Sequence, residues 1–223
     1  MPRFSPAHPS GAHLSTEVIE YGPGIPTEAE LRLVGDVAGK RVLNLGCGAG
    51  SAAIALARQG AKVIAVDASA SQLAAARTAA EAAEVKLELH HAPLAELAFV
   101  RADTIDVALS VYGFAGIDDV DRVFRQVDRC LKPERPMVFS VSHPVADIVD
   151  LDDRARVHRA YDAADPIGWM QGEDTMIEYP RTISSLFTSL GRANFRVDTI
   201  LEPVPRGQLV PPTLIIRARK QGT

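Results

Sequence analysis

A glycine-rich turn between an apolar strand and a helix is the feature that most constrains what this chain can fold into. The segment VLNLGCGAGSAAIALA places Gly46, Gly48 and Gly50 between a near-continuous apolar run and an alanine-rich helical pattern. Missing side chains let backbone N–H groups approach a ligand, and the amino end of the helix adds positive partial charge. Such a turn alone is weak evidence, because tight strand-to-helix connections need glycine in any case. Its surroundings must decide what it binds.

Strand and helix patterns alternate from residue 40 to about residue 143. An apolar run predicts a strand covered on both faces over 40–47, and further strands are predicted over 62–67, 86–90, 104–111 and 136–143. Helical patterns cover 51–60, 69–84 and 118–131, and the capping-box spacing of Thr27 and Glu30 predicts an earlier helix over 28–37. This rhythm requires a mainly parallel α/β sheet with right-handed crossovers.

The alternation stops between residues 144 and 182, where the chain is polar. This stretch follows the fifth strand, at the edge where open α/β sheets bind ligands, so we predict a lid or substrate-recognition insertion over 144–182. A helix over 183–195 and two strands, 195–204 and 212–220, follow it. No helix fits between these two strands, so they form a hairpin and the last strand is antiparallel.

Composition narrows the function classes. The 223 residues suit one domain, with residues 1–26 as a lead-in or flap, and no apolar run reaches the about 18 residues of a membrane span. No secretory signal is visible, and Cys47 and Cys130 form neither a disulfide framework nor a zinc motif, which favours the cytoplasm and no metal. A net charge of −4 with interspersed signs disfavours nucleic acid as a partner, and the oligomeric state is left open.

The position of Asp67 narrows the kind of ligand that the glycine turn would bind. It ends the second apolar strand, where a carboxylate can accept both hydroxyls of a ribose; the simpler interpretation is a surface residue that caps the next helix. A dinucleotide site would place a third glycine at Ser51, and a phosphate-binding P-loop would require Gly-Lys-Ser/Thr after the turn. Both alternatives are disfavoured.

NLGCGAG followed by VIAVDAS resembles the nucleotide-binding signature of class I S-adenosylmethionine-dependent methyltransferases, particularly the methyltransferase-type-11 group. Segment 106–144 is similar to that family's fourth strand, following helix and fifth strand, and RCLKPERP stands at its R-x-L-K-P-G-G turn. The resemblance covers about residues 18–220. It implies a Rossmann-like seven-stranded sheet of order 3-2-1-4-5-7-6, with strand 7 antiparallel and helices on both faces, in a single methyltransferase domain over 1–223.

The resemblance also implies how the cofactor, S-adenosylmethionine, is held. The glycine turn would pass beneath its methionine part, Asp67 would hold the ribose, and Ala68 would flank the adenine. The end of the fourth strand would line the sulfonium, and Tyr21 would close over the cofactor unless it merely packs on the sheet. The implied contacts are Tyr21, Asn44, Gly46, Cys47, Gly48, Gly50, Asp67, Ala68, Ala92, Pro93, Leu94, Ser110 and Val111.

Two positions depart from the family pattern. Asn44 stands where an acidic residue is common, so the methionine ammonium would lose a charge attraction. After the third strand, HHAPLAEL lacks the acidic residue that often faces the adenine amine, so Ala92, Pro93 and Leu94 would offer backbone groups and apolar contact instead.

For the chemistry, His143 and Tyr112 are the candidate catalytic residues. His143 follows the fifth strand and could act as a general base, or it could be a structural residue that bonds a loop. The acceptor contacts are predicted to be His13, Tyr112, His143, Trp169, Tyr179 and Arg181. Arg181 would suit a carboxylate or phosphate, and each of Tyr112, Trp169, Tyr179 and Arg181 could instead pin the insertion to the sheet.

The resulting hypothesis is methyl transfer to a small-molecule O or N nucleophile by in-line displacement. A noncatalytic protein that binds the cofactor or a partner, and a protein methyltransferase, are the alternatives.

Overall fold

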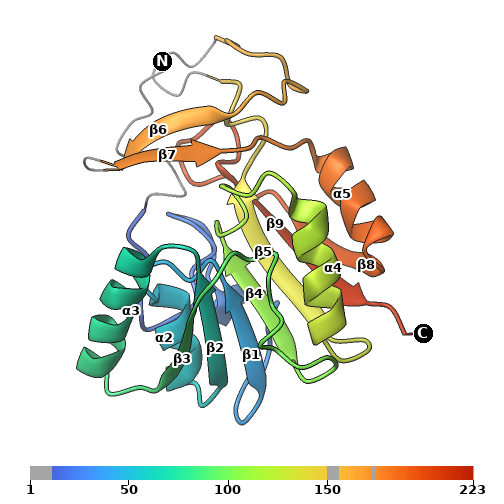
Figure 1. Cartoon of the computed structure of the whole chain (residues 1–223). Helices are drawn as coiled ribbons and strands as arrows, with labels where there is room; N and C mark the ends of the chain where they lie inside the picture. The colour runs from blue at the N-terminus through green and yellow to red at the C-terminus, as the bar shows by residue number, and fades with distance from the viewer. Residues whose placement is uncertain (1–11, 150–155, 172–173, 223) are drawn as a thin grey trace.

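A seven-stranded sheet forms the centre of the protein (Figure 1). The structure is a computed structural model and describes residues 12–149, 156–171 and 174–222. The order of the strands is β3-β2-β1-β4-β5-β9-β8, with β1 to β5 parallel and β9 antiparallel to both of its neighbours. Their bounds are β1 Arg41–Leu45, β2 Lys62–Asp67, β3 Leu87–His91, β4 Val107–Val111, β5 Pro136–Ser142, β8 Phe195–Leu201 and β9 Thr213–Lys220. Since β8 and β9 are the sixth and seventh strands of this sheet, the predicted order and the antiparallel last strand are confirmed.

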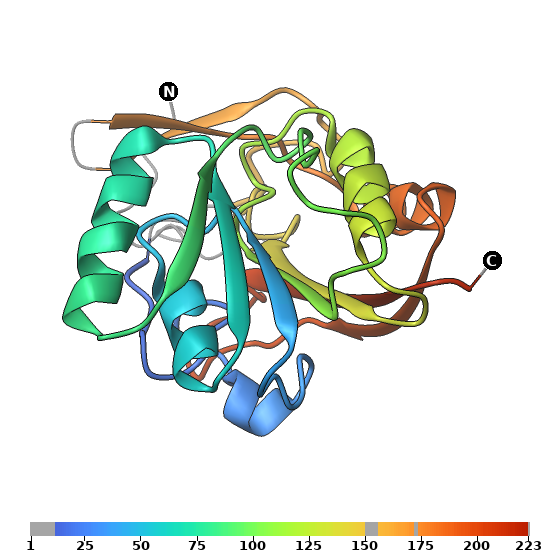
Figure 2. The ribbon, with the colours of Figure 1, turned by 60° about the horizontal axis from the view of Figure 1, so that its bottom comes forward.

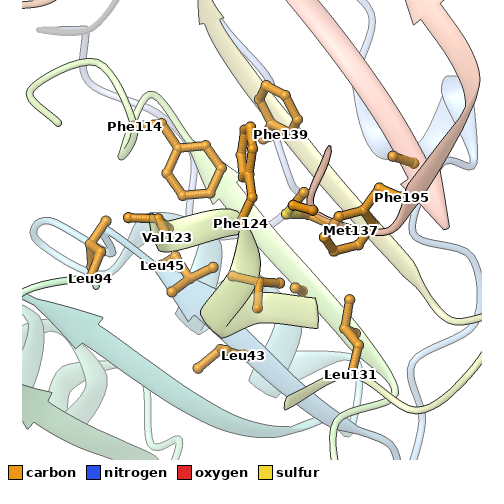
Figure 3. Packing of buried hydrophobic residues seen from close by; sticks show 14 of the residues in the cluster. Leu43, Leu45, Leu94, Phe114, Val123, Phe124, Leu131, Met137, Phe139 and Phe195 are labelled. Atoms are coloured by element: carbon orange, nitrogen blue, oxygen red, sulfur yellow. The ribbon is translucent and has the colours of Figure 1, made fainter. Parts of the chain in front are cut away.

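Helices cover both faces of the sheet (Figure 2). On one face α2 (Ser51–Arg58) and α3 (Ala70–Ala82) pack on one apolar cluster, and on the other face α4 (Val120–Cys130) and α5 (Ile183–Arg192) pack on a second. In the second cluster the rings of Phe114, Phe124 and Phe139 lie 5.3 to 5.6 Å apart between centroids (Figure 3). This aromatic group joins the end of β4 to α4 and β5, and so fixes the loop that follows β4.

The first helix is shorter than the sequence pattern predicts. The prediction was 28–37, whereas α1 covers Glu28–Leu31 and ends at Arg32, whose φ of 50° is left-handed. The physical cause is Glu28, whose buried carboxylate accepts backbone N–H groups of Leu33, Val34 and Gly35 at 2.8 to 2.9 Å. These bonds replace the helical ones and turn the chain away.

The polar segment after β5 contains an antiparallel hairpin that the sequence did not indicate. It consists of β6 (Ile167–Gln171) and β7 (Asp174–Glu178), and it lies across the carboxyl ends of the parallel strands (Figure 1). Parts of the predicted insertion, 150–155 and 172–173, lie outside the described residues. The backbone N–H of Tyr179 donates to Ala115 O at 2.9 Å, so the end of β7 is attached to the loop after β4.

Candidate cofactor and acceptor site

The strand order reverses between β1 and β4, and this defines the ligand edge of the sheet. The chain leaves β1 toward α2 on one face and leaves β4 toward α4 on the other face. In open α/β sheets, ligands bind at such a switch point outside the carboxyl ends of the strands. The residues predicted to bind the cofactor come from the loops after β1, β2, β3 and β4, which meet at this edge.

The three glycines of the turn have three different reasons to be glycine. A Cβ on Gly46 would lie 2.4 Å from Gly113 Cα, so Gly46 lets the loops after β1 and β4 touch. A Cβ on Gly50 would lie 3.1 Å from Ala76 Cβ, so Gly50 serves the packing of α2 on α3. Above Gly48 the nearest atom is Gln72 Oε1 at 3.8 Å, which leaves room for a ligand. Of the three, Gly48 is the glycine that leaves space for a ligand at the open edge.

Asp67, at the end of β2, is fixed by two backbone groups. Its Oδ2 accepts the N–H of Gly48 at 2.8 Å, and its Oδ1 accepts the N–H of Ser69 at 2.8 Å. Each carboxylate oxygen keeps a second lone pair, so the group can still accept two ribose hydroxyls. Asp67, the residue predicted to bind the ribose, is therefore held in place by the glycine turn.

Asn44 and Cys47 lie below this carboxylate. Asn44 is 1% exposed, its amide N–H donates to Leu109 O at 3.2 Å, and no described residue donates to its Oδ1. Such a buried acceptor without a partner is costly, and a ligand ammonium or a water would satisfy it. Burial and the nearby Asp67 raise the pKa of the Cys47 thiol to about 12, so Cys47 stays a neutral packing group.

The loop after β3 forms the side predicted to face adenine. Ala92 N–H donates to Asp67 O at 3.1 Å, and a ring nitrogen of His91 lies 2.9 Å from Ala68 O. The side chain of Leu94 points into the core, 3% exposed, while Pro93 is exposed. Since the Ala92 N–H is already occupied, the backbone contact to adenine predicted there lacks its most direct donor.

At the end of β4, Tyr112 has a φ of 54°, which is strained for a side chain of this size. Its hydroxyl lies 2.5 Å from Thr213 Oγ1 and is walled by Gly22, where a Cβ would come within 2.3 Å of it. Burial raises the pKa of this phenol, so it stays neutral. Ser110 lies beneath Gly113, and Val111 packs against the cluster under α2. The Tyr112 hydroxyl thus points into the protein.

His143 follows β5 as predicted, and both of its ring nitrogens are occupied. Its Nε2 lies 2.7 Å from Glu202 Oε1, and its Nδ1 accepts the backbone N–H of Val145 at 3.1 Å. The side chain is 3% exposed. To act as a general base, His143 would first have to release the Val145 N–H.

The predicted acceptor contacts are only partly brought together. Arg181 donates to the carbonyl oxygens of Phe114, Ile117, Asp118 and Tyr179, so its guanidinium holds the loop after β4 rather than facing a site for an anion. Trp169 is buried on β6, His13 is exposed, and Tyr179 is half-buried beside Ala115. Arg181 and Tyr179 pin the insertion, which was the alternative interpretation.

Part of the segment predicted as an N-terminal lead-in or flap, 1–26, packs in the core. Residues 1–11 lie outside the described residues, while Ile19, Tyr21 and Ile25 are buried in the cluster under α2. The Tyr21 hydroxyl donates to Glu28 Oε2 at 2.5 Å, and burial raises its pKa. Tyr21 therefore packs within the core, where it supports the turn that ends α1.

Three residues that the sequence did not single out matter at this edge. Gly113 is the partner of Gly46, and Asp147 and Glu178 are buried carboxyl groups 4% and 3% exposed. Asp147 follows His143 by one helical turn's length, and Glu178 ends β7. The sequence predicted a polar insertion over 144–182 without indicating which of its residues are buried, and the structure shows that these two acids are.

Taken together, the strand order, the switch point and the fixed Asp67 define a Rossmann-like domain built to bind a nucleoside at the carboxyl ends of β1 and β2. Within the described residues, no helix is both long and apolar enough to cross a membrane.

Comparison with known proteins narrows the class of this domain. The methyltransferase domain family matches residues 42–134, which run from β1 to just beyond α4. A putative S-adenosylmethionine-dependent methyltransferase from Listeria monocytogenes has a TM-score of 0.72 at 25% identity, covering 87% of this chain and 98% of its own. An S-adenosylmethionine-dependent methyltransferase from Mesorhizobium loti has a TM-score of 0.70 at 26% identity, covering 86% and 95%.

Similarity to curated proteins is confined to one part of the chain. The ubiquinone biosynthesis O-methyltransferase of Acinetobacter baylyi is 33% identical over 107 residues, which are 48% of this chain and 45% of that protein. The match thus spans a little under half the length of the curated relatives. Residues 42–134 match a methyltransferase domain, and the similarity of the chain to S-adenosylmethionine-dependent methyltransferases supports S-adenosylmethionine as its cofactor.

The residues at the edge fit this cofactor. The open space above Gly48 suits the methionine part, the unpartnered Asn44 Oδ1 suits an ammonium, and the Asp67 carboxylate suits the ribose. The adenine side has the weaker fit, because Ala92 and Leu94 are engaged elsewhere.

Proposed function

We propose that the protein transfers the methyl group of S-adenosylmethionine to an oxygen or nitrogen nucleophile of a small molecule. The observation that carries this proposal is the Asp67 carboxylate, held by Gly48 and Ser69 N–H groups at the switch point beside the open face of the glycine turn. The partial similarity to ubiquinone biosynthesis O-methyltransferases favours oxygen as the nucleophile.

The bound cofactor supplies an electrophilic methyl group on a sulfonium, so the chain's own contribution is positioning and the exclusion of water. Asp67 would hold the ribose and Gly48 would border the methionine part, while the β6–β7 hairpin covers the carboxyl ends of the strands where the acceptor would lie. Alignment of two reactants lowers a barrier by about 7–11 kcal/mol in favourable cases. A cytoplasmic location and a small-molecule acceptor stay predictions of the same proposal.

The test is transfer of label from methyl-labelled S-adenosylmethionine to metabolites extracted from cells, followed by identification of the product. We expect a labelled small molecule, and we expect Asp67→Ala to abolish its formation at low cofactor concentration. Tight cofactor binding without a labelled product would favour a noncatalytic binding protein, and label found only on protein would favour a protein methyltransferase.

A further inference from the structure

A hydroxyl acceptor needs a group that takes its proton, and the two predicted catalytic residues are occupied. The Nδ1 of His143 accepts the Val145 N–H, and the Tyr112 hydroxyl is bonded to Thr213. A small cavity near the ends of β4, β5 and β7 is lined by two other titratable groups, Asp147 and Glu178.

This cavity lies where the acceptor of a class I fold is expected, beyond the ends of β4 and β5 and beneath the end of β7. Its polar lining is Ser142, Asp147, Glu178 and Arg181, and its apolar lining includes Phe114 and Leu186. The free volume is about 10 Å³, enough for one water-sized group. A water molecule or the oxygen of a hydroxyl group has the size of this space.

Ser142 adds a polar group to this lining. It is the last residue of β5, it is 5% exposed, and its hydroxyl bonds to the Glu178 carboxyl, which lowers the pKa of that carboxyl. The polar lining of the cavity therefore favours a hydrogen-bonding group over an apolar one.

The two carboxyl groups share an electrostatic environment that holds a proton near neutral pH. Burial raises the pKa of Asp147 to about 7, opposed by Arg159, and burial together with Asp147 raises the pKa of Glu178 to about 8, opposed by the nearby Ser142 and Arg181. Tyr112 also faces Glu178 and stays neutral. Two interacting carboxyls of this kind titrate as a pair, and the pair with one proton is a base suited to neutral pH.

We propose that the Asp147–Glu178 pair receives the proton of a neutral hydroxyl acceptor whose oxygen is bound beside Ser142. This rests on the proposed function. The proton leaves the acceptor oxygen for the ionised carboxyl of the pair, and the freed lone pair of that oxygen forms the bond to the transferred methyl carbon. The electron pair of the broken carbon–sulfur bond stays on sulfur, so charge and protons balance without a further reactant.

The same arrangement selects against anionic acceptors. Arg181, which lines the cavity, donates its guanidinium to backbone carbonyls of the loop after β4. An acceptor with a carboxylate at this position would be repelled by the negative charge of the pair. No third His, Cys, Asp or Glu of the described chain joins the pair to complete a metal-binding group.

The first experiment identifies the acceptor class. The enzyme is incubated with labelled S-adenosylmethionine and matched probes, namely phenol and catechol against benzoate and phenyl phosphate, and also with a metabolite extract. We expect methyl ethers of neutral hydroxyl compounds. Methyl esters or N-methyl products alone would overturn the inference and leave the proposed function standing, whereas no product of any kind would overturn both.

The second experiment tests the pair itself. We expect Glu178→Gln and Asp147→Asn each to lower kcat by at least about 100-fold, the usual range for a lost general base, with S-adenosylhomocysteine affinity changed less than threefold. The double variant should be no slower than the slower single variant, because the two groups act as a unit. Glu81→Gln, on the exposed face of α3, is the matched control.

A readout besides activity separates a proton acceptor from a structural pair. In the wild type bound to S-adenosylhomocysteine, the infrared band of a protonated carboxyl should disappear as the pH rises through neutrality, together with the rise of kcat/KM, and both should be missing in the double variant. A loss of kcat in Glu202→Gln with Glu178→Gln unaffected would assign the proton to His143 and refute the proposal. If the carboxyl variants fail to fold, Ser142→Ala must raise the acceptor KM at least tenfold.

Discussion

Replacement of Asp67 by Ala separates the two tasks that its carboxylate performs. The carboxylate accepts Gly48 and Ser69 N–H groups at 2.8 Å, and its remaining lone pairs are predicted to accept two ribose hydroxyls. A hydrogen bond to a charged group contributes about 1.5–3 kcal/mol, so two of them contribute about 3–6 kcal/mol, which is about 100-fold to 10,000-fold in affinity. Part of any loss in Asp67→Ala will nevertheless come from the freed backbone groups of the glycine turn.

A thermodynamic cycle removes that ambiguity. Calorimetry gives the Kd of S-adenosylhomocysteine and of its 2′,3′-dideoxy analogue for the wild type and for Asp67→Ala. We expect the wild type to prefer the hydroxylated ligand by at least about 100-fold, and Asp67→Ala to prefer it by less than about tenfold, because the dideoxy ligand cannot use the carboxylate. Equal discrimination by both proteins would show that Asp67 only shapes the turn, and the ribose assignment would then be wrong.

The other predictions concern stability, measured by thermal unfolding. Gly113→Ala places a Cβ 2.4 Å from a backbone oxygen of β1, so it should cost about 1–3 kcal/mol, or several degrees in Tm, whereas Gly191→Ala in α5 meets nothing within 4 Å and should be neutral or slightly stabilising. Arg181→Met should cost at least about 2 kcal/mol, because it leaves carbonyl oxygens of the loop after β4 without donors. Burial raises the pKa of Asp147 and of Glu178 above their unfolded values, so the folded state binds more protons and stability should fall as the pH rises from about 5 to 8. The double variant Asp147→Asn, Glu178→Gln should show a flatter dependence of Tm on pH. A wild-type Tm that rises over this range would refute the assignment.

The parts of the fold that the sequence predicted are those fixed by local pattern. Mostly buried apolar runs identified β1, β2, β4 and β5, and the closing strands were recognised as a hairpin because no helix fits between them. The length of α1 was overestimated, because periodicity does not show that the Glu28 carboxylate accepts the N–H groups of Leu33, Val34 and Gly35. The β6–β7 hairpin was missed, because alternation over five residues is weak against a polar background.

The same distinction applies to the site. Gly48 and Asp67 are close in sequence, and their contact follows from one strand–turn–helix–strand unit, so a short motif predicts it. For Arg181 the sequence left two interpretations open, a contact to an anionic acceptor or a residue that pins the insertion, because the carbonyls between Phe114 and Asp118 that it binds are more than sixty residues away in the chain. A guanidinium that binds distant backbone cannot be told from one that binds a ligand by sequence alone.

This difference in range bears on how such an enzyme can change its acceptor. The predicted glycine-turn and ribose contacts to the cofactor lie within residues 44–69, where the backbone fixes the Asp67 carboxylate directly. The acceptor half is assembled from separate segments: Tyr112 meets Thr213 across 101 positions, and the Asp147–Glu178 pair joins the loop after β5 to the end of β7. Substitutions in the insertion therefore alter the polarity and proton affinity around the acceptor without disturbing Gly48 or Asp67. Since distant sites contribute additively to free energies, we expect changes at Glu178 to act on acceptor choice and rate while cofactor affinity stays nearly constant.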